Sequence, residues 1–318
     1  MTSLRITVTG ANGFVGQALC AALHQSGHRV TAAVRTPIES TKPYPLVPVG
    51  DIHSATEWKP ALLASDVVVH LAGRAHVMRD AQSDALALYR KINVEGSVRL
   101  AEQAAEAGVR RLIFMSSIKV NGEVTGERPF TEEDPPSPPD PYGISKLEAE
   151  RALYEVCSRS RLELAILRPT LIYGFGAKGN LMQLMKAVDR GWPLPIGAVR
   201  NRRSLLGMGN LIGAVKVCLI HPAAAGATFL IADEQPVSSS QLAISVGHAL
   251  GRPARLLPVP VSMLRLAGAM TGNSAAVNRL TSSLVVDSSK IRKTLGWRST
   301  HPFEQGIADM VLGYREGA

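Results

Sequence analysis

Tyr142 and Lys146 are the residues whose types and spacing carry the clearest chemistry in this sequence. They open the helix-like stretch YGISKLEAERALYEV, and residues four apart lie on one face of a helix, so the phenol and the ammonium point into the same space. A free tyrosine titrates at about pH 10, and a nearby positive charge favours the phenolate. The pair predicts an acid–base couple that works near neutral pH, although exposed amphipathic helices contain the same spacing.

Two hydroxyls and a loop precede this pair. Ser116 and Ser117 end an apolar, strand-like run and form a plausible donor pair for a substrate oxygen. The segment Pro129–Pro141 carries six of the chain's 20 prolines, so it cannot hold a regular helix or a central strand. Because it ends directly before Tyr142, we expect it to form a wall of the active site; a plain surface loop is the alternative.

Residues 9–16, TGANGFVG, lie between a predicted strand and a predicted helix. Gly10 permits a tight turn, Gly13 lets the backbone approach a pyrophosphate, and Gly16 lets the helix pack on the strand. The N–H groups at the start of the helix would face the anion. The pattern predicts a dinucleotide site that includes Gly10, Asn12, Gly13, Phe14, Val15 and Gly16.

The end of the second predicted strand bears on the choice of dinucleotide. An acidic residue there would bind the ribose 2′-hydroxyl of NAD, but the sequence reads Ala33-Val34-Arg35. An arginine can pair with a 2′-phosphate, so the sequence favours NADP, with NAD possible. An ordinary surface arginine is the alternative.

The elements that must position these residues alternate between apolar strands and amphipathic helices, which predicts a doubly wound parallel sheet of Rossmann type, an α/β fold. We expect a dinucleotide-binding domain at 1–169, with 203–232 returning to it, and a smaller C-terminal substrate-binding lobe at 170–202 and 233–318. The strands are predicted at Arg5 to Thr9, Arg29 to Val34, Leu46 to Val49, Val67 to Leu71, Arg111 to Met115 and Leu164 to Leu167.

Composition narrows the class of protein. The net charge of +9 comes from scattered residues and not from a basic stripe, so it does not predict a nucleic-acid partner. No apolar run approaches the ~18 residues of a membrane span, and the N-terminus lacks the regions of a secretory signal, so we expect a cytoplasmic enzyme. The three distant cysteines predict neither a disulfide framework nor a metal site.

The motifs TGANGFVG, HLAG, KINVEG, FMSS and YGISK occur in this order, and the chain resembles the extended short-chain dehydrogenases that act on nucleotide sugars. The resemblance implies that Ser117 polarises the reacting oxygen, Tyr142 moves its proton, and Lys146 holds the nicotinamide ribose and, with an oxidised nicotinamide, lowers the tyrosine pKa. It also implies further cofactor contacts at Asp51, Ile52, Leu71, Ala72, Gly73, Asn93 and Ser116.

On the substrate side, the resemblance implies that Arg203 and Arg279 grip a nucleotide diphosphate, which suits paired guanidinium groups. His76, Lys119 and Asn180 are further candidates for substrate contacts. It also implies a homodimer packed through helices that include the Tyr142 helix.

The segments SSIKVNGE, DPYGISKLEAE and NRRSL are most similar to bacterial enzymes that reduce UDP-4-keto-6-deoxy-N-acetylhexosamines in O-antigen synthesis. Leu171 stands where many 4-epimerases have asparagine, and Lys119 and Asn121 replace their usual threonine and tyrosine. The leading hypothesis is therefore an NAD(P)H-dependent 4-reductase of such a UDP-sugar. The alternative is an NAD-dependent UDP-hexose or UDP-N-acetylhexosamine 4-epimerase, and a non-catalytic dinucleotide sensor is a third hypothesis.

Overall fold

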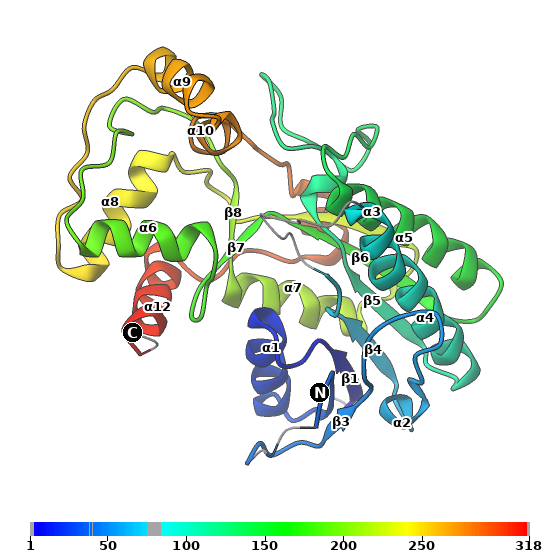
Figure 1. Ribbon diagram of the computed structural model, residues 1–318. Helices are drawn as coiled ribbons and strands as arrows, with labels where there is room; N and C mark the ends of the chain where they lie inside the picture. The colour runs from blue at the N-terminus through cyan, green and yellow to red at the C-terminus, as the bar shows by residue number, and fades with distance from the viewer. Residues whose placement is uncertain (1–2, 38, 40, 75–83, 317–318) are drawn as a thin grey trace.

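The computed structural model describes residues 3–37, 39, 41–74 and 84–316. Its centre is a seven-stranded parallel sheet in the order β3-β2-β1-β4-β5-β6-β9 (Figure 1). All residues of the two central strands β4 and β5 are buried, as expected where helices cover both faces of a parallel sheet. The strands are β1 Arg5–Thr9, β2 Arg29–Val34, β3 Leu46–Pro48, β4 Val67–His70, β5 Arg111–Met115, β6 Glu163–Pro169 and β9 Ala227–Ile231.

Helices lie on both faces of this sheet, which confirms the predicted Rossmann-type α/β fold. One face packs against α1 (Phe14–Gln25), α7 (Met208–Ile220) and α11 (Ser289–Leu295), and the other against α2 (Lys59–Leu62), α4 (Gly96–Glu106) and α5 (Pro141–Ser158). Short elements complete this part: α3 (Ala85–Tyr89), the π-helix η1 (Arg90–Glu95), and the 3₁₀ turns η2 (Ile118–Val120) and η3 (Pro222–Ala224).

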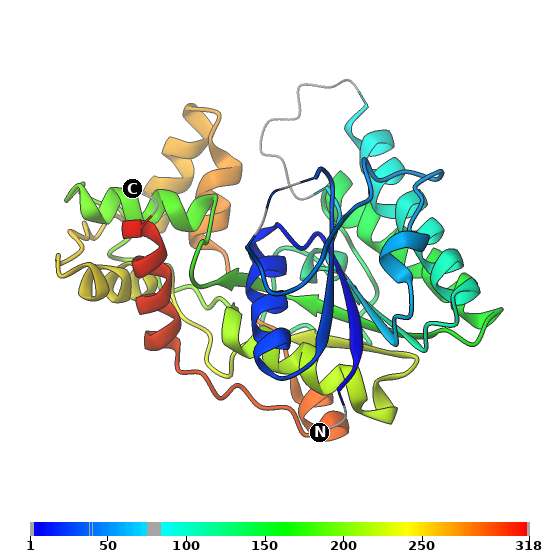
Figure 2. The same cartoon turned by 90° about the horizontal axis from the view of Figure 1, so that it is seen from below.

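The remaining helices gather at one side of the sheet, away from α4 and α5 (Figures 1 and 2). They are α6 (Asn180–Asp189), α8 (Ser239–Leu250), α9 (Val261–Met270), α10 (Ser274–Thr281) and α12 (Phe303–Glu316), joined by a small sheet of β7 (Leu171–Tyr173) and β8 (Leu205–Gly207). Tyr173, α6, α8 and α12 share a separate apolar core. We call α6, α8, α9, α10 and α12 the helical lobe; the domain boundaries expected from the sequence stay a prediction.

Candidate active site

The glycine-rich turn between β1 and α1 is built as the sequence predicts. Gly10 has a φ of +65°, and a Cβ there would come within 2.9 Å of the Ala72 backbone. A Cβ on Gly16 would overlap the Gly10 carbonyl oxygen, so only glycine lets the helix start this close to the strand. No side chain caps the N-terminus of α1, which begins after Gly13. The turn is therefore a cradle whose free N–H groups suit a phosphate.

A series of buried hydrogen bonds connects Thr9, the first residue of this turn, to η1. The Ser97 hydroxyl donates to the Asn93 carbonyl over 2.6 Å, so its oxygen accepts from His70 Nε2 at 2.8 Å. His70 Nδ1 consequently accepts from the Thr9 hydroxyl at 2.7 Å, and the Thr9 oxygen accepts the N–H of Leu71 at 3.2 Å. Burial lowers the pKa of His70 to about 3, and the imidazole is neutral. These bonds join the end of β1 to η1.

Asn93 continues this series of hydrogen bonds toward the catalytic helix. Its amide oxygen accepts the Arg74 N–H at 2.8 Å, and its amide nitrogen donates to the Ser145 hydroxyl at 3.0 Å. Ser145 in turn donates to the Tyr142 carbonyl over 2.8 Å. Asn93 lies in the π-helical turn, a distortion that is often found at functional sites. The glycine-rich turn and the backbone of Tyr142 are thus linked through buried side chains and the Asn93 carbonyl.

Tyr142 and Lys146 lie in the first turns of α5, as expected. Lys146 is buried, its Nζ donates to the Met115 carbonyl at 2.9 Å, and it lies 4.5 Å from the centre of the Phe114 ring. Burial lowers the pKa of Lys146 to about 8, against a rise caused by Glu150. Burial raises the pKa of Tyr142 to about 12, although a hydrogen bond with Ser117 lowers it. In the chain alone the phenol therefore keeps its proton at neutral pH.

The predicted serine pair separates into two roles, and the expectation for Ser116 as a donor to substrate is corrected. The Ser116 hydroxyl donates to the buried Glu150 carboxylate, which also pairs with Arg168. Ser117 lies before η2 and shares a hydrogen bond with Tyr142. Of the two hydroxyls, that of Ser117 lies beside Tyr142, and its contact with a substrate oxygen stays a prediction.

Two departures from the usual 4-epimerase pattern have structural roles here. Asn121 accepts a hydrogen bond from the buried Arg168 at 2.9 Å and donates to the Thr131 carbonyl. Lys119, a predicted substrate contact, forms ion pairs with Asp140 at 2.5 Å and with Glu123 at 3.4 Å. Because Asp140 caps the helix that carries Tyr142, Lys119 supports that helix.

The proline-rich loop is also hydrogen-bonded to the segment that follows α10. The Phe130 N–H donates to the Val285 carbonyl at 2.8 Å, and the Asp287 N–H donates back to the Phe130 carbonyl at 2.8 Å. Leu284 pairs in turn with the segment around Arg203. The loop therefore runs between the segment that follows α10 and the start of α5, and its role as a wall of the site stays a prediction.

The candidate diphosphate arginines are brought together. Arg203 Nη1 donates to the Arg279 and Ser282 carbonyls at 3.2 and 3.1 Å. Burial lowers the pKa of Arg203, Glu123 raises it, and the positive charge of Arg279 lowers it further. An anion bound near Arg203 would offset the repulsion between the two positive charges. Asn180 is exposed at the start of α6, and His76 lies outside the described residues.

At the sheet edge beyond β2, Arg35 is exposed and lies 3.4 Å from the equally exposed Asp51. Ile52 packs against Gly96 at the start of α4, where a Cβ would collide with it. The predicted adenine side of the cradle thus carries one positive and one negative charge.

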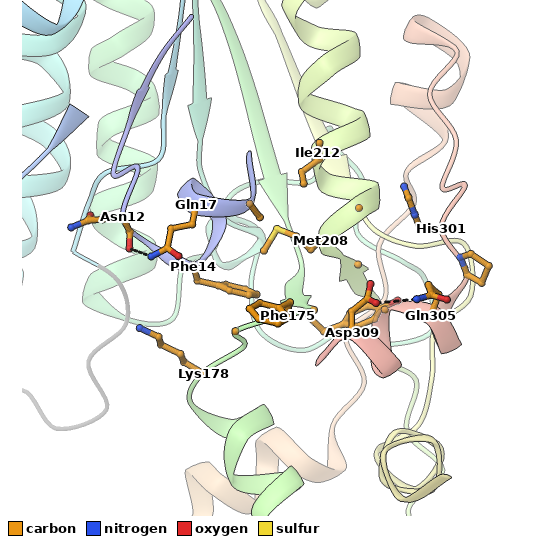
Figure 3. A pocket seen from close by; sticks show the side chains of 18 of the residues that line it. Asn12, Phe14, Gln17, Phe175, Lys178, Met208, Ile212, His301, Gln305 and Asp309 are labelled. Carbon is orange, nitrogen blue, oxygen red and sulfur yellow. Dashed lines mark hydrogen bonds between the residues drawn. The ribbon is translucent and has the colours of Figure 1, made fainter. Parts of the chain in front are cut away.

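A pocket of about 570 Å³ lies on the outer side of the glycine-rich turn (Figure 3). Its lining residues come from the glycine-rich turn, α1, the loop after β7, the start of α7 and α12, and they include Asn12, Phe14, Phe175, Met208 and Asp309. It shares Asn12 and Phe14 with the predicted cofactor contacts, whereas Tyr142, Lys146 and Ser117 are not among its lining residues.

Sequence reasoning missed Thr9, His70, Ser97 and Glu150. Thr9, His70 and Glu150 lie inside the quoted segments TGANGFVG, HLAG and DPYGISKLEAE, and Ser97 directly follows KINVEG. A polar residue inside an apolar strand or helix is the signal that could have found them. Over the part of the chain that is described, no group of three His, Cys, Asp or Glu side chains could hold a metal ion. No described helix is long and apolar enough to cross a bilayer.

Solved structures share this fold. The crystal structure of UDP-N-acetylglucosamine 4-epimerase from Bacillus cereus aligns with a TM-score of 0.80 at 22% identity, covering 98% of this chain and 100% of that one. MoeE5 in complex with UDP-glucuronic acid and NAD aligns with a TM-score of 0.78 at 25% identity, covering 99% and 100%. The fold and site define a dinucleotide-binding enzyme of the short-chain dehydrogenase type.

Sequence relatives then give the family. A UDP-glucose 4-epimerase of Vibrio cholerae is 43% identical over 97% of this chain and 95% of its own length. An N-acetyl-α-D-glucosaminyl-diphospho-ditrans,octacis-undecaprenol 4-epimerase of Escherichia coli O157:H7 is 30% identical over 85% and 84%. The model of the NAD dependent epimerase/dehydratase family matches residues 6–232, and the chain belongs to this family.

Proposed function

We propose that this protein is an NAD-dependent 4-epimerase of a UDP-hexose or UDP-N-acetylhexosamine. The observation that carries the proposal is the placement of Tyr142 beside Ser117, with the buried Lys146 one turn further along α5. The relatives support this alternative better than the 4-reductase hypothesis, because the 43% identical Vibrio cholerae protein is a UDP-glucose 4-epimerase. A homodimer packed through α5 is part of the proposal.

The chain's residues fit a dinucleotide. The cradle of Gly10, Gly13 and Gly16 leaves room that a Cβ would fill, and the open end of α1 would receive the pyrophosphate. The preference for NADP, expected from Arg35, has no support among the relatives, whereas MoeE5 binds NAD. The Asp51 carboxylate beside Arg35 would also repel a 2′-phosphate, which favours NAD.

When bound, NAD would supply a hydride acceptor for the sugar C4. In the proposed reaction, Ser117 donates a hydrogen bond to the C4 oxygen, and Tyr142 removes the hydroxyl proton as the C4 hydrogen leaves. After the sugar has turned its other face, the same hydride would return to C4 and Tyr142 would give the proton back to the oxygen, so that no net oxidation occurs. Lys146 keeps a positive charge near the phenol, which favours the phenolate that this step needs.

The proposal is tested by incubating the purified protein with UDP-glucose and with UDP-N-acetylglucosamine, followed by sugar analysis and by cofactor absorbance. We expect interconversion of the 4-epimers without net oxidation of added NADH or NADPH. Stoichiometric oxidation of NADPH by UDP-4-keto-6-deoxy-N-acetylglucosamine, with no epimerisation, would restore the reductase hypothesis. NAD binding without either reaction would favour the non-catalytic sensor.

A second candidate substrate is a polyprenyl-diphosphate sugar, because the Escherichia coli relative acts on one. Such a molecule shares the diphosphate and the hexose with a UDP-sugar but carries a lipid in place of uridine. Arg203 and Arg279 suit the diphosphate of either substrate, and α10, which carries Arg279, packs against a helix with exposed apolar side chains. Epimerisation of the lipid-linked sugar, measured beside UDP-N-acetylglucosamine, separates the two.

A further inference from the structure

Helix α9 is apolar on more sides than its contacts explain. It packs inward through Leu264 and through Gly268, where a Cβ would collide with Val277 of α10. Met263, Leu266 and Met270 are 60%, 63% and 80% exposed. At 3.6 residues per turn these three side chains fall within an arc of about 60°, on the side opposite Leu264 and Gly268. A helix that is apolar all round is normally covered, so this face suits a partner.

The charge around α9 indicates what that partner is. Residues 235–286 contain four arginines, Arg252, Arg255, Arg265 and Arg279, and no aspartate or glutamate. Arg265 on α9 itself and Arg255 just before it are exposed. Apolar side chains flanked by arginines, without acidic residues between them, are the composition of a helix that lies in the interface of an anionic membrane.

α9 and α10 pack together as a helical hairpin, and the position of this hairpin is consistent with an anionic membrane as the partner. α9 and α10 lie at the upper end of the helical lobe in Figure 1, and α12 lies at its lower end. With ten residues, α9 is too short to span a bilayer, which takes about 20. Arg203 contacts the Arg279 carbonyl at the inner side of this hairpin, so the candidate diphosphate site lies next to the apolar surface.

We propose that the α9 face of Met263, Leu266 and Met270, with the neighbouring arginines, docks the protein reversibly onto an anionic lipid bilayer. The apolar side chains enter the headgroup region and the arginines pair with lipid phosphates. The proposal holds for either substrate class above, because the surface is separate from Tyr142 and Lys146.

Co-sedimentation with vesicles tests the docking in the absence of substrate. We expect the full chain to pellet with vesicles of phosphatidylglycerol and phosphatidylcholine, and at least tenfold less with phosphatidylcholine alone or in high salt. The triple variant Met263→Gln/Leu266→Gln/Met270→Gln is expected to bind the anionic vesicles at least tenfold more weakly. Ile220→Gln and Leu312→Gln, which replace side chains 60% and 52% exposed elsewhere, are matched controls that retain binding.

A second variant and a second measurement keep the test decisive. Arg255→Gln/Arg265→Gln leaves the apolar face intact and is expected to weaken vesicle binding, with a smaller salt dependence. Epimerisation of UDP-N-acetylglucosamine by both variants is expected to match the unsubstituted protein, which shows that they fold. The proposal is overturned if the protein stays in the supernatant with anionic vesicles, or if the triple variant pellets normally. Self-association that the triple variant abolishes in sedimentation velocity would also overturn it, because a second copy would then cover the face.

Discussion

The carboxyl edge of the sheet and the helical lobe use polar residues in opposite ways. At the sheet edge, Thr9, His70 and Asn93 are buried and bonded side chain to side chain or to nearby backbone. Beside the lobe, Arg203 donates to the backbone carbonyls of Arg279 and Ser282, and Arg279 on α10 adds a second positive charge. Chemistry requires fixed geometry before the ligand arrives, whereas recognition of a diphosphate requires charge that the ligand itself can compensate.

The largest expected effect is a loss of activity in Tyr142→Phe, beside the carboxyl edge of the sheet. Removal of the phenol oxygen should lower kcat by about 10²–10⁴-fold, because one group both removes and returns the proton. NAD binding, measured by calorimetry, should change little, since the cradle and the Asn93 bonds remain. A variant that keeps normal turnover would remove Tyr142 from the acid–base role.

A smaller effect, on substrate binding and not on turnover, is expected for Arg279 in the helical lobe. Arg279→Gln should raise KM for the UDP-sugar by roughly 10–100-fold, the equivalent of losing one charge-assisted hydrogen bond, and leave kcat nearly unchanged. The exposed Arg202→Gln is the matched control. If Arg279→Gln instead lowered kcat and left KM unchanged, the division between catalysis at the sheet edge and substrate recognition in the helical lobe would be wrong.

The smallest effect concerns the pH dependence of stability. Because the pKa of His70 falls from an ordinary value of about 6.5 to about 3, the unfolded chain binds an extra proton between these values. The free energy of unfolding therefore falls as the pH drops below about 6.5, and His70 should lower it by about 1.4 kcal/mol at pH 5.5. His70→Gln should flatten this part of the unfolding curve measured by urea at several pH values. The exposed His248→Gln should not change it.

Local sequence patterns predict the strands and the glycine-rich turn well, but they do not predict which distant residues meet. β1, β2 and β5 match their predicted bounds because each is rich in apolar and β-branched residues and ends next to turn or loop residues. The glycine-rich turn and the spacing of Tyr142 and Lys146 are local patterns, and the structure places them as expected. The seventh strand, β9, was foreseen only as a segment that returns to the sheet.

What the sequence could not predict are bonds between distant residues. Ser116 meets Glu150 across 34 positions, and His70 meets Thr9 across 61. No spacing rule connects such residues; strand order brings them together, and Ser116 was therefore assigned to the wrong partner. Arg35 is similar, since its neighbour Asp51 lies on the next strand's extension.

The proline-rich loop has a mechanical consequence. Its first part is hydrogen-bonded to residues 283–287, on which Arg203 also pairs, and its last residues cap and begin the Tyr142 helix. A displacement of residues 283–287 would therefore reach the start of the Tyr142 helix through one short loop. Contact with the far end of a substrate and the position of the phenol at its reacting carbon would be coupled through the backbone, in addition to the charge that Arg203 supplies.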